Sequence, residues 1–249
     1  MDWTERFTSR VENYSKYRPD YPQEVLDLII AECNLSKESV VVDVGSGTGK
    51  LSELFLSHGY GVIGIEPNRA MREEAEKLLR RYDNFTSLDA RAEATTLADS
   101  SVDIITAGQA FQWFETTQTR SEFERILKPS SWVVLVWNDR RLDSPFLADY
   151  EQLLMSFTDY LPVDKDWAEG VIRSFFEPGL LKTRCFASSQ VVDFESLKGG
   201  LLSASYSPEA GHPAYERMME NLKSLFNRYH DGSHVVLEYD TRVFYGRLT

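Results

Sequence analysis

Apolar residues along the first 137 positions alternate between two spacings. Short continuous runs rich in β-branched residues, such as Val40–Val44, are typical of strands buried on both faces of a sheet. Between these runs, apolar residues recur every three to four positions, which is the spacing of one face of a helix. The predicted strands cover residues 40–44, 61–65, 85–88, 102–106 and 132–136. Strands that alternate with helices through short loops predict a parallel sheet with helices on both faces.

Four helical stripes are predicted in this part of the chain. They are Val25, Leu26, Ile29 and Ile30; Leu51, Leu54 and Phe55; Met71, Ala75, Leu78 and Leu79; and Phe123, Ile126 and Leu127. Asn68 is a suitable N-cap for the third helix, and Glu73 and Lys77 are spaced as an ion pair on its outer side. Pro129 is expected to stop the fourth helix.

The alternation ends after the fifth strand. Residues 143–181 are predicted to be helical, and they carry more apolar side chains than a simple crossover needs to cover. We expect part of this surface to form a lid over the carboxyl edge of the sheet. Its large apolar residues include Phe146, Leu153, Leu154, Phe157, Trp167, Phe175 and Phe176. Strands are expected again at 184–192 and 235–245, with a helix over about 214–229 between them.

The composition limits the possible partners. Lys and Arg total 27 against 39 Asp and Glu, for a net charge of −12, and such a chain repels nucleic acid on average. Cys33 and Cys185 lack metal-ligand spacing and predict neither a zinc site nor a disulfide framework, so a reducing cytoplasm is the expected location. His230 and His234 flank a turn and have no third ligand, so no metal is predicted. The sequence contains no run of 18 apolar residues, so a membrane partner is not predicted. The oligomeric state is not predicted either.

The sequence VVDVGSGTGKL, Val41–Leu51, places three glycines in five positions where a strand meets a helix. A phosphate-binding P-loop is excluded, because Val44 and Leu51 replace its first glycine and its hydroxyl residue. A dinucleotide fingerprint is weakened, because Lys50 stands where its third glycine is expected. The third possibility is a nucleoside ligand without phosphate, whose polar tail lies against the turn.

Glu66 favours a ligand that contains a ribose, either a dinucleotide or a nucleoside without phosphate. It follows the second strand, where a carboxylate can accept hydrogen bonds from both hydroxyls of a ribose. The alternative interpretation is that Glu66 only ends the strand before Pro67.

These residues carry a resemblance to a known family. The run Val41–Gly49, Glu66, the stretch AGQAFQWF (107–114) and the stretch ILKPSSWVVLVWN (126–138) resemble the class I S-adenosylmethionine-dependent methyltransferases. Within them, and with the opening YSKYRPDYP (14–22), the chain is similar to the small-molecule branch that includes methyltransferase type 11 and trans-aconitate methyltransferases. The match covers about residues 10–140.

The resemblance implies a Rossmann-like, seven-stranded, mostly parallel sheet with an antiparallel C-terminal strand, 235–245, beside the fifth strand. It implies one methyltransferase domain, 1–249. We expect an N-terminal cap segment at 10–32, a cofactor-binding core at 40–138 and a helical lid insertion at 139–181. Residues 182–249 would complete the sheet.

The resemblance also implies a set of positions that bind S-adenosylmethionine. Gly45, Gly47 and Gly49 would pass its methionine part, Asp43 would orient the turn, and Glu66 would hold the ribose. The remaining expected contacts are Ser46, Pro67, Asn68, Met71, Ala92, Gln109, Tyr14 and Arg18. Arg91 replaces the Asp that many relatives use for the adenine amino group, and since Arg91 cannot accept a hydrogen bond, Glu93 or a carbonyl is expected to do so.

Gln109, Gln112 and Trp113 follow the fourth strand and are expected to border the reacting methyl group. Gln112 stands where close relatives commonly have histidine. Trp113 could offer a π face to the sulfonium or only pack beneath the lid. Methyl transfer is an in-line displacement that needs alignment and water exclusion. A dedicated acid–base pair is not required if the acceptor is a carboxylate or another existing nucleophile, whereas a hydroxyl or amine acceptor could need a base, for which the sequence names no clear candidate.

The predicted function is methyl transfer from S-adenosylmethionine to a small-molecule acceptor. Two alternatives stay open at this point: a nicotinamide-dependent oxidoreductase, which Glu66 favours and Lys50 opposes, and a noncatalytic sensor that binds the same cofactor.

Overall fold

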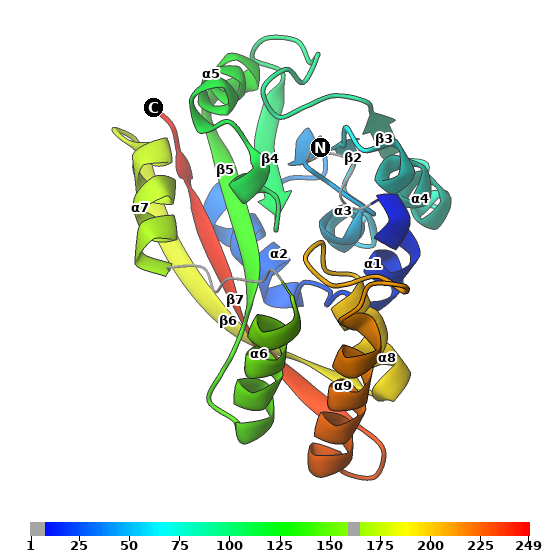
Figure 1. Cartoon of the computed structure of the whole chain (residues 1–249). Helices are drawn as coiled ribbons and strands as arrows, with labels where there is room; N and C mark the ends of the chain where they lie inside the picture. Colours follow the sequence, from blue (N-terminus) through cyan, green and yellow to red (C-terminus); the bar gives the residue numbers. More distant parts are fainter. Residues whose placement is uncertain (1–7, 159–164) are drawn as a thin grey trace.

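The computed structural model describes residues 8–158 and 165–249, without the side chains of 165–167. The described residues form a seven-stranded sheet in the order β3-β2-β1-β4-β5-β7-β6 (Figure 1). Its strands are β1 Val41–Val44, β2 Val62–Ile65, β3 Phe85–Leu88, β4 Val102–Gly108, β5 Leu127–Arg140, β6 Leu180–Val192 and β7 Val235–Arg247. The strands from β3 to β5 pair in parallel, whereas β7 is antiparallel to both β5 and β6. The predicted fold class, with its antiparallel C-terminal strand, is therefore confirmed.

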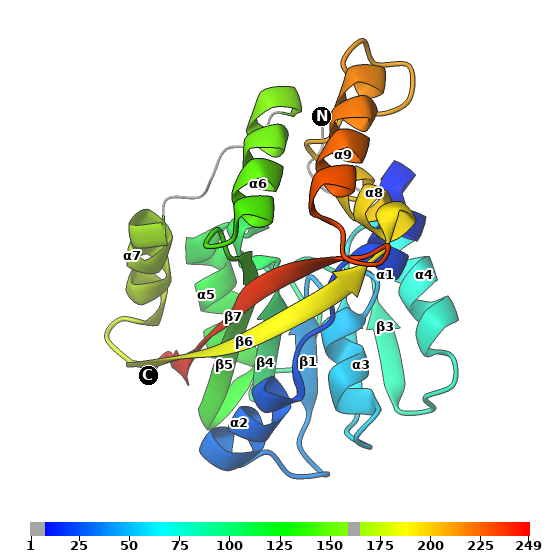
Figure 2. The same ribbon diagram turned by 90° about the horizontal axis from the view of Figure 1, so that it is seen from below.

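Helices cover both faces of this sheet. They are the 3-10 helices η2 Thr8–Arg10 and η3 Phe111–Trp113, and the α-helices α1 Val11–Tyr17, α2 Gln23–Cys33, α3 Lys50–Leu56, α4 Arg69–Leu79, α5 Thr116–Ile126, α6 Pro145–Phe157, α7 Lys165–Phe176, α8 Phe194–Leu202 and α9 Tyr215–Tyr229. Helices α2 and α3 lie on one face, and α5 and α7 lie on the other (Figure 2).

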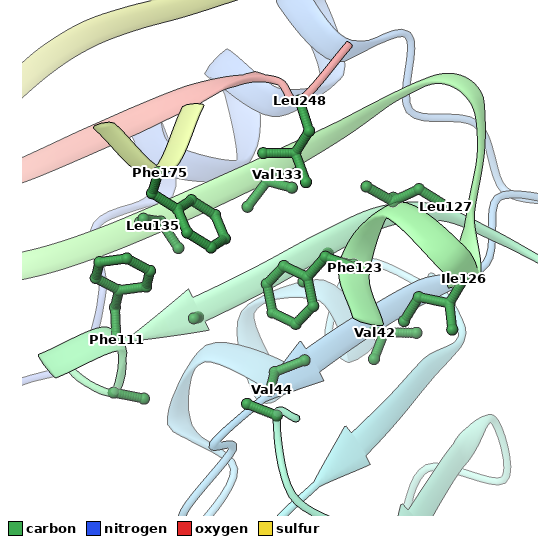
Figure 3. Close-up of a cluster of buried hydrophobic side chains, with 14 of the residues drawn as sticks. Val42, Val44, Phe111, Phe123, Ile126, Leu127, Val133, Leu135, Phe175 and Leu248 are labelled. Carbon is green, nitrogen blue, oxygen red and sulfur yellow. The ribbon is translucent and has the colours of Figure 1, made fainter. Parts of the chain in front are cut away.

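The core beneath α5 and α7 is built from aromatic rings on aliphatic strand residues (Figure 3). Phe123 of α5 and Phe175 of α7 meet edge to face with their ring centroids 6.0 Å apart, a favoured geometry for aromatic pairs. Val42 and Leu135 are fully buried in the same cluster. This packing fixes the strand ends from which the functional turns emerge.

A second core lies beyond the carboxyl edge of the parallel strands. The long strands β5, β6 and β7 continue past their neighbours, with Arg140 of β5 paired to Tyr239 of β7. Helices α6, α8 and α9 pack on one another and on this extension as a cap (Figure 2). Leu147, Leu201 and Met218, one from each helix, are almost fully buried there. The cap therefore stands over the edge where ligands bind in open α/β sheets.

Two details of the predicted helices are wrong. Ile30 and Leu78, assigned to inward stripes, are 39% and 43% exposed. Each is the chain neighbour of a buried residue, Ile29 or Leu79, and is therefore rotated by about 100° around the helix away from the buried face. Glu73 pairs with Arg69 at 2.6 Å instead of Lys77, which pairs with Glu74. Arg69 is also four residues from Glu73, so the spacing alone allowed either partner.

The segment expected to act as a lid divides into two parts with different surroundings. Phe146, Leu153 and Leu154 of α6 belong to the cap, whereas Phe175 and Phe176 of α7 pack into the main core. Residues 180 and 181 already belong to β6, and Leu127, assigned to a helix, begins β5. Trp167 lies outside the described side chains. Helix α8 was not predicted at all.

Candidate functional site

The glycine turn after β1 has a backbone that glycine alone adopts easily. Gly45, Gly47 and Gly49 have φ values of +68°, +57° and +85°, in the left-handed region that side chains disfavour. The amides of Gly45 and Ser46 both donate to the carbonyl of Ile65, at 2.8 and 3.1 Å. The turn is thus tied to the end of β2, where Glu66 begins.

Glu66 links this turn to the start of α4. Its Oε2 accepts from the Gly47 amide at 2.9 Å and its Oε1 accepts from the Asn68 amide at 2.8 Å. Burial raises the pKa of Glu66, although these two amide hydrogen bonds oppose the shift. Each carboxylate oxygen keeps a second acceptor position, which is what a pair of ribose hydroxyls requires.

A narrow cavity of about 70 Å³ opens beside this carboxylate. Its wall combines the turn, the start of α4 and the loop after β4. The predicted cofactor residues on it are Tyr14, Gly45, Gly47, Glu66, Pro67, Asn68, Met71, Ala92 and Gln109. Asn68 caps α4 by accepting from the Met71 amide at 3.0 Å, which holds both residues on the wall.

A larger cavity of about 540 Å³ lies on the other side of the turn, beneath the cap. This volume is in the range of about 300–1,000 Å³ that small-molecule sites occupy. Its floor includes Asp43, Ser46 and Arg18, and its far wall comes from α6, α8 and β7. Gln112 lies on its exposed rim, where its Nε2 donates to the Gln109 carbonyl at 2.8 Å.

Five residues line both cavities: Tyr14, Gly45, Gly108, Gln109 and Trp113. Gln109 has a φ of +56°, a conformation that is strained for a residue with a side chain and that tends to occur at functional sites. Its Nε2 donates to the Asn138 carbonyl at 3.1 Å, which fixes the side chain against β5. The two cavities therefore meet where the residues expected near the reacting methyl lie.

Two residues expected to bind the cofactor do not line either cavity. A Cβ on Gly49 would lie 2.5 Å from Leu79 Cδ1, so the packing of the turn against α4 requires a glycine there. Glu93 Oε1 accepts from the Glu115 amide at 2.8 Å. The expectation that these two residues contact the cofactor stays a prediction.

Asp43 is completely buried below the turn. Its carboxylate accepts from Ser52 Oγ at 2.7 Å and from Thr106 Oγ1 at 3.2 Å. Burial raises the pKa of Asp43 to about 7, although the two hydroxyl donors oppose the shift. Asp43 thus anchors β1, α3 and β4 around the turn.

Several residues of the larger cavity were not singled out from the sequence. They are Arg140, Tyr150, Tyr206 and Tyr239. The Arg140 guanidinium lies 4.9 Å from the centroid of the Tyr150 ring and 3.7 Å from Glu151 Oε2. These residues come from β5, α6, β7 and the loop after α8, so no local sequence pattern links them.

The tyrosines of this cavity are neutral hydroxyl groups. Burial raises the pKa of Tyr14, Tyr21, Tyr150 and Tyr239. They can donate and accept hydrogen bonds near neutral pH but do not serve as bases.

Polar atoms near the turn fit a ligand with a charged tail. Thr48 Oγ1 and Arg18 Nε are buried and have no hydrogen-bond partner among the described residues, and both residues line the larger cavity. Buried polar atoms are normally hydrogen-bonded, so such atoms beside a cavity indicate groups that a ligand satisfies. Together with the Glu66 carboxylate, they match the two polar ends of S-adenosylmethionine.

The fold and the paired cavities define a Rossmann-like enzyme that binds a nucleoside cofactor. A family described as a methyltransferase domain matches residues 42–135. An uncharacterized methyltransferase-like protein of Schizosaccharomyces pombe is 27% identical over 244 residues, which cover 96% of this chain and 93% of that protein. An uncharacterized methyltransferase of Mycobacterium tuberculosis is 32% identical over 139 residues, 56% of this chain and 54% of that protein.

Solved structures share the architecture. A candidate type II methyltransferase from Anaeromyxobacter dehalogenans has a TM-score of 0.69 at 21% identity, and the match covers 93% of this chain and 98% of that one. A phosphoethanolamine N-methyltransferase of Haemonchus contortus, solved with S-adenosyl-L-methionine, has a TM-score of 0.55 at 15% identity, over 99% of this chain and 58% of that one. The matched domain and these relatives support an S-adenosylmethionine-dependent methyltransferase, whose cofactor is S-adenosylmethionine. The comparisons favour methyl transfer over the oxidoreductase interpretation.

None of the helices in residues 8–158 and 165–249 is long and apolar enough to cross a membrane. Within the same residues, no cluster of His, Cys, Asp and Glu has the arrangement of a metal site.

Replacing Glu66 with alanine is expected to weaken S-adenosylhomocysteine binding by about 1–3 kcal/mol. The ribose hydroxyls and the backbone amides of Gly47 and Asn68 would all lose a charged hydrogen-bond acceptor. Calorimetry checks this. Glu66→Gln keeps one acceptor oxygen and should lose less. Unchanged affinity in folded Glu66→Ala protein would show that Glu66 only shapes the strand end.

Proposed function

We propose that this protein transfers a methyl group from S-adenosylmethionine to a small, anionic acceptor that binds in the larger cavity. The observation that carries the proposal is the charge of that cavity. Its charged lining consists of Arg18, Lys50 and Arg140 against one described carboxylate, Asp43. A cationic cavity within a chain of net charge −12 indicates selection for an anion.

Arg140 is the residue best placed to recognise the anion. Lys50 already pairs with Asp20 at 2.7 Å, and Arg18 lies beside the cofactor turn over the Tyr14 ring. Arg140 has Glu151 as its ion-pair partner, but at 3.7 Å that contact is longer than a hydrogen bond. A planar guanidinium with several N–H donors suits a carboxylate or a similar planar anion.

The lining of the larger cavity also favours an acceptor whose nucleophile is already ionised. Among its described lining residues there is no histidine or cysteine, and Asp43 lies buried below the turn. The surrounding tyrosines are held neutral by burial. A nucleophile that is already ionised at neutral pH, such as a carboxylate oxygen, needs no proton removal from this protein.

The chain's own residues then align the reaction. S-adenosylmethionine, when bound, supplies a methyl group on a positively charged sulfur. Gln109 and Trp113, which line both cavities, form the boundary through which the acceptor reaches that methyl. Helices α6 and α8 keep bulk water away from the acceptor, and neutral tyrosine hydroxyls orient it.

A panel of small acceptors tests this function. Labelled S-adenosylmethionine is incubated with the protein and with matched pairs of organic carboxylates and their neutral amides. We expect label in the carboxylates alone, as esters that alkali hydrolyses. Transfer to the amides at equal rates would contradict an anionic acceptor.

Replacing Arg140 with glutamine is expected to lower kcat/KM for a carboxylate acceptor about 10- to 150-fold, because a charge-assisted hydrogen bond is lost. The affinity for S-adenosylhomocysteine should stay within about twofold, since Arg140 does not line the smaller cavity. Arg141→Gln is the matched control: Arg141 is the next residue, it pairs with Asp143, and it does not line the larger cavity. Equal loss in both variants would refute a specific role for Arg140.

A further inference from the structure

Residues 8–18, which we name the strap, touch both ligand cavities. Tyr14 lines the smaller and the larger cavity, and Arg18 lines the larger one. At the cofactor end, Asn68 Nδ2 donates to Thr8 Oγ1 at 3.0 Å, and Asn68 is itself on the wall of the smaller cavity. The strap is therefore a covalent connection between the two sites.

Two residues after Thr8, the strap holds the wall of the acceptor cavity through Arg10. The Arg10 guanidinium donates to the carbonyls of Leu202 at 3.2 Å, Ser207 at 2.7 Å and also Ala204. These carbonyls lie at and just after the C-terminal end of α8, where helix carbonyls lack partners and a cation is favoured. Arg10 is only 9% exposed, so this interaction is shielded from solvent.

A second anchor joins the strap to the same helix. The Tyr17 ring lies so close to α8 that a Cβ on Gly199 would come within 2.0 Å of it. The Gln190 Nε2 donates to the Tyr17 carbonyl at 3.3 Å. A shift of the strap is therefore expected to move α8 and residues 203–207. Leu197 and Gly200 of α8 and the following Ala204 line the acceptor cavity.

The smaller cavity gives a reason for the strap to shift. Its volume of about 70 Å³ is well below the roughly 300 Å³ at the lower end of ligand sites. A nucleoside in this cavity gains room if part of the wall moves, and Tyr14 is the part of that wall that the strap contributes. We propose that the strap couples the two sites, so that cofactor binding sets the acceptor wall, with Arg10 as the positioning residue.

This inference rests on the proposed function, and one experiment separates the two. Hydrogen exchange is measured with and without S-adenosylhomocysteine, and calorimetry gives its affinity. In the unmodified protein we expect exchange to slow at residues 45–49 and 66–71, and also by about fivefold or more at 197–207. No binding of S-adenosylhomocysteine would refute the proposed function, whereas binding with protection confined to 45–71 would refute only the coupling.

Two variants test the anchors independently. In Arg10→Ala the ligand should still bind and protect 45–49, but its effect on 197–207 should disappear, and Arg10→Lys should restore part of it. Gly199→Ala should uncouple the segments in the same way without touching Arg10. Arg228→Ala is the control, because Arg228 joins two cap helices through Asp149 but does not contact the strap. Ligand-induced protection at 197–207 that persists in both Arg10→Ala and Gly199→Ala would overturn the proposal.

Discussion

Replacing Gly47 with valine is expected to abolish measurable S-adenosylhomocysteine binding, with a loss of affinity of about 100-fold or more. Gly47 has a φ of +57°, which costs a residue with a side chain about 1–2 kcal/mol and a β-branched one more. A Cβ at this position would point across the smaller cavity, 3.6 Å from Met71 Cε. The valine methyl groups would therefore fill the space that the nucleoside needs.

The backbone strain must be separated from the filled cavity. Gly232 has a φ of +59°, and a Cβ there would meet no atom within 4 Å, so Gly232→Val carries the same strain at a distance from the site. Both variants should lose similar free energy of unfolding in urea, but Gly232→Val alone should bind with normal affinity. A folded Gly47→Val protein that binds as tightly as the control would show that the turn does not face the cofactor.

The strands of the main sheet could be predicted because their signals are local. Val41–Val44 and Ile104–Thr106 are continuous buried runs, and a central parallel strand needs no information from elsewhere to be recognised. The same applies to Asn68, whose role as an N-cap depends on the next three residues.

Helix α8 could not be predicted, because its stabilising contact lies far away in the sequence. Gly199 and Gly200 oppose helix formation by propensity, yet Gly199 is the residue that lets the Tyr17 ring lie directly against the helix. Arg10 then satisfies the carbonyls at the helix end. Local propensity and tertiary packing disagree here, and packing decides.

Arg140 was missed for a related reason. Arg140 reaches the cavity because β5 extends to pair with Tyr239 of β7, and the register of that pair is set across about 100 residues of chain. The family resemblance, which ends near residue 140, gave no role to either residue. For Gly49 the motif indicated a cofactor contact, whereas the structure gives a packing reason for the glycine, because a Cβ there would meet Leu79.

Replacing Asp43 with asparagine is expected to make the protein more stable than the unmodified form at alkaline pH. Burial raises the pKa of Asp43 to about 7 in the folded protein. In the unfolded chain an aspartate ionises near pH 4, so between about pH 4 and 7 the folded state holds a proton that the unfolded state releases. The stability that Asp43 contributes is therefore complete below about pH 4 and is lost as the pH rises through 7. A shift of about three units corresponds to a loss of about 4 kcal/mol as an upper bound.

Asparagine keeps the shape of the protonated carboxyl group without this titration. Ser52 and Thr106 donate to different oxygens of Asp43, so the single asparagine oxygen can still accept from one of these hydroxyls. The other hydroxyl can rotate to accept from the asparagine amide. Urea unfolding from pH 5 to 8.5 should show the two proteins diverging up to about pH 7 and keeping a constant difference above it, with Asp43→Asn ahead at the alkaline end. Curves that stay parallel over this range would contradict a raised pKa for Asp43.

Ser52→Ala in both backgrounds gives a sharper test through a double-mutant cycle. The Ser52 hydroxyl donates to the Asp43 carboxylate at 2.7 Å and so favours its ionised form. Its removal should cost more at pH 8 than at pH 5 when Asp43 is present, because the buried charge then loses a donor. In the Asp43→Asn background the cost should be nearly independent of pH. Equal pH dependence in the two backgrounds would mean that Ser52 acts through packing rather than through the charge of Asp43.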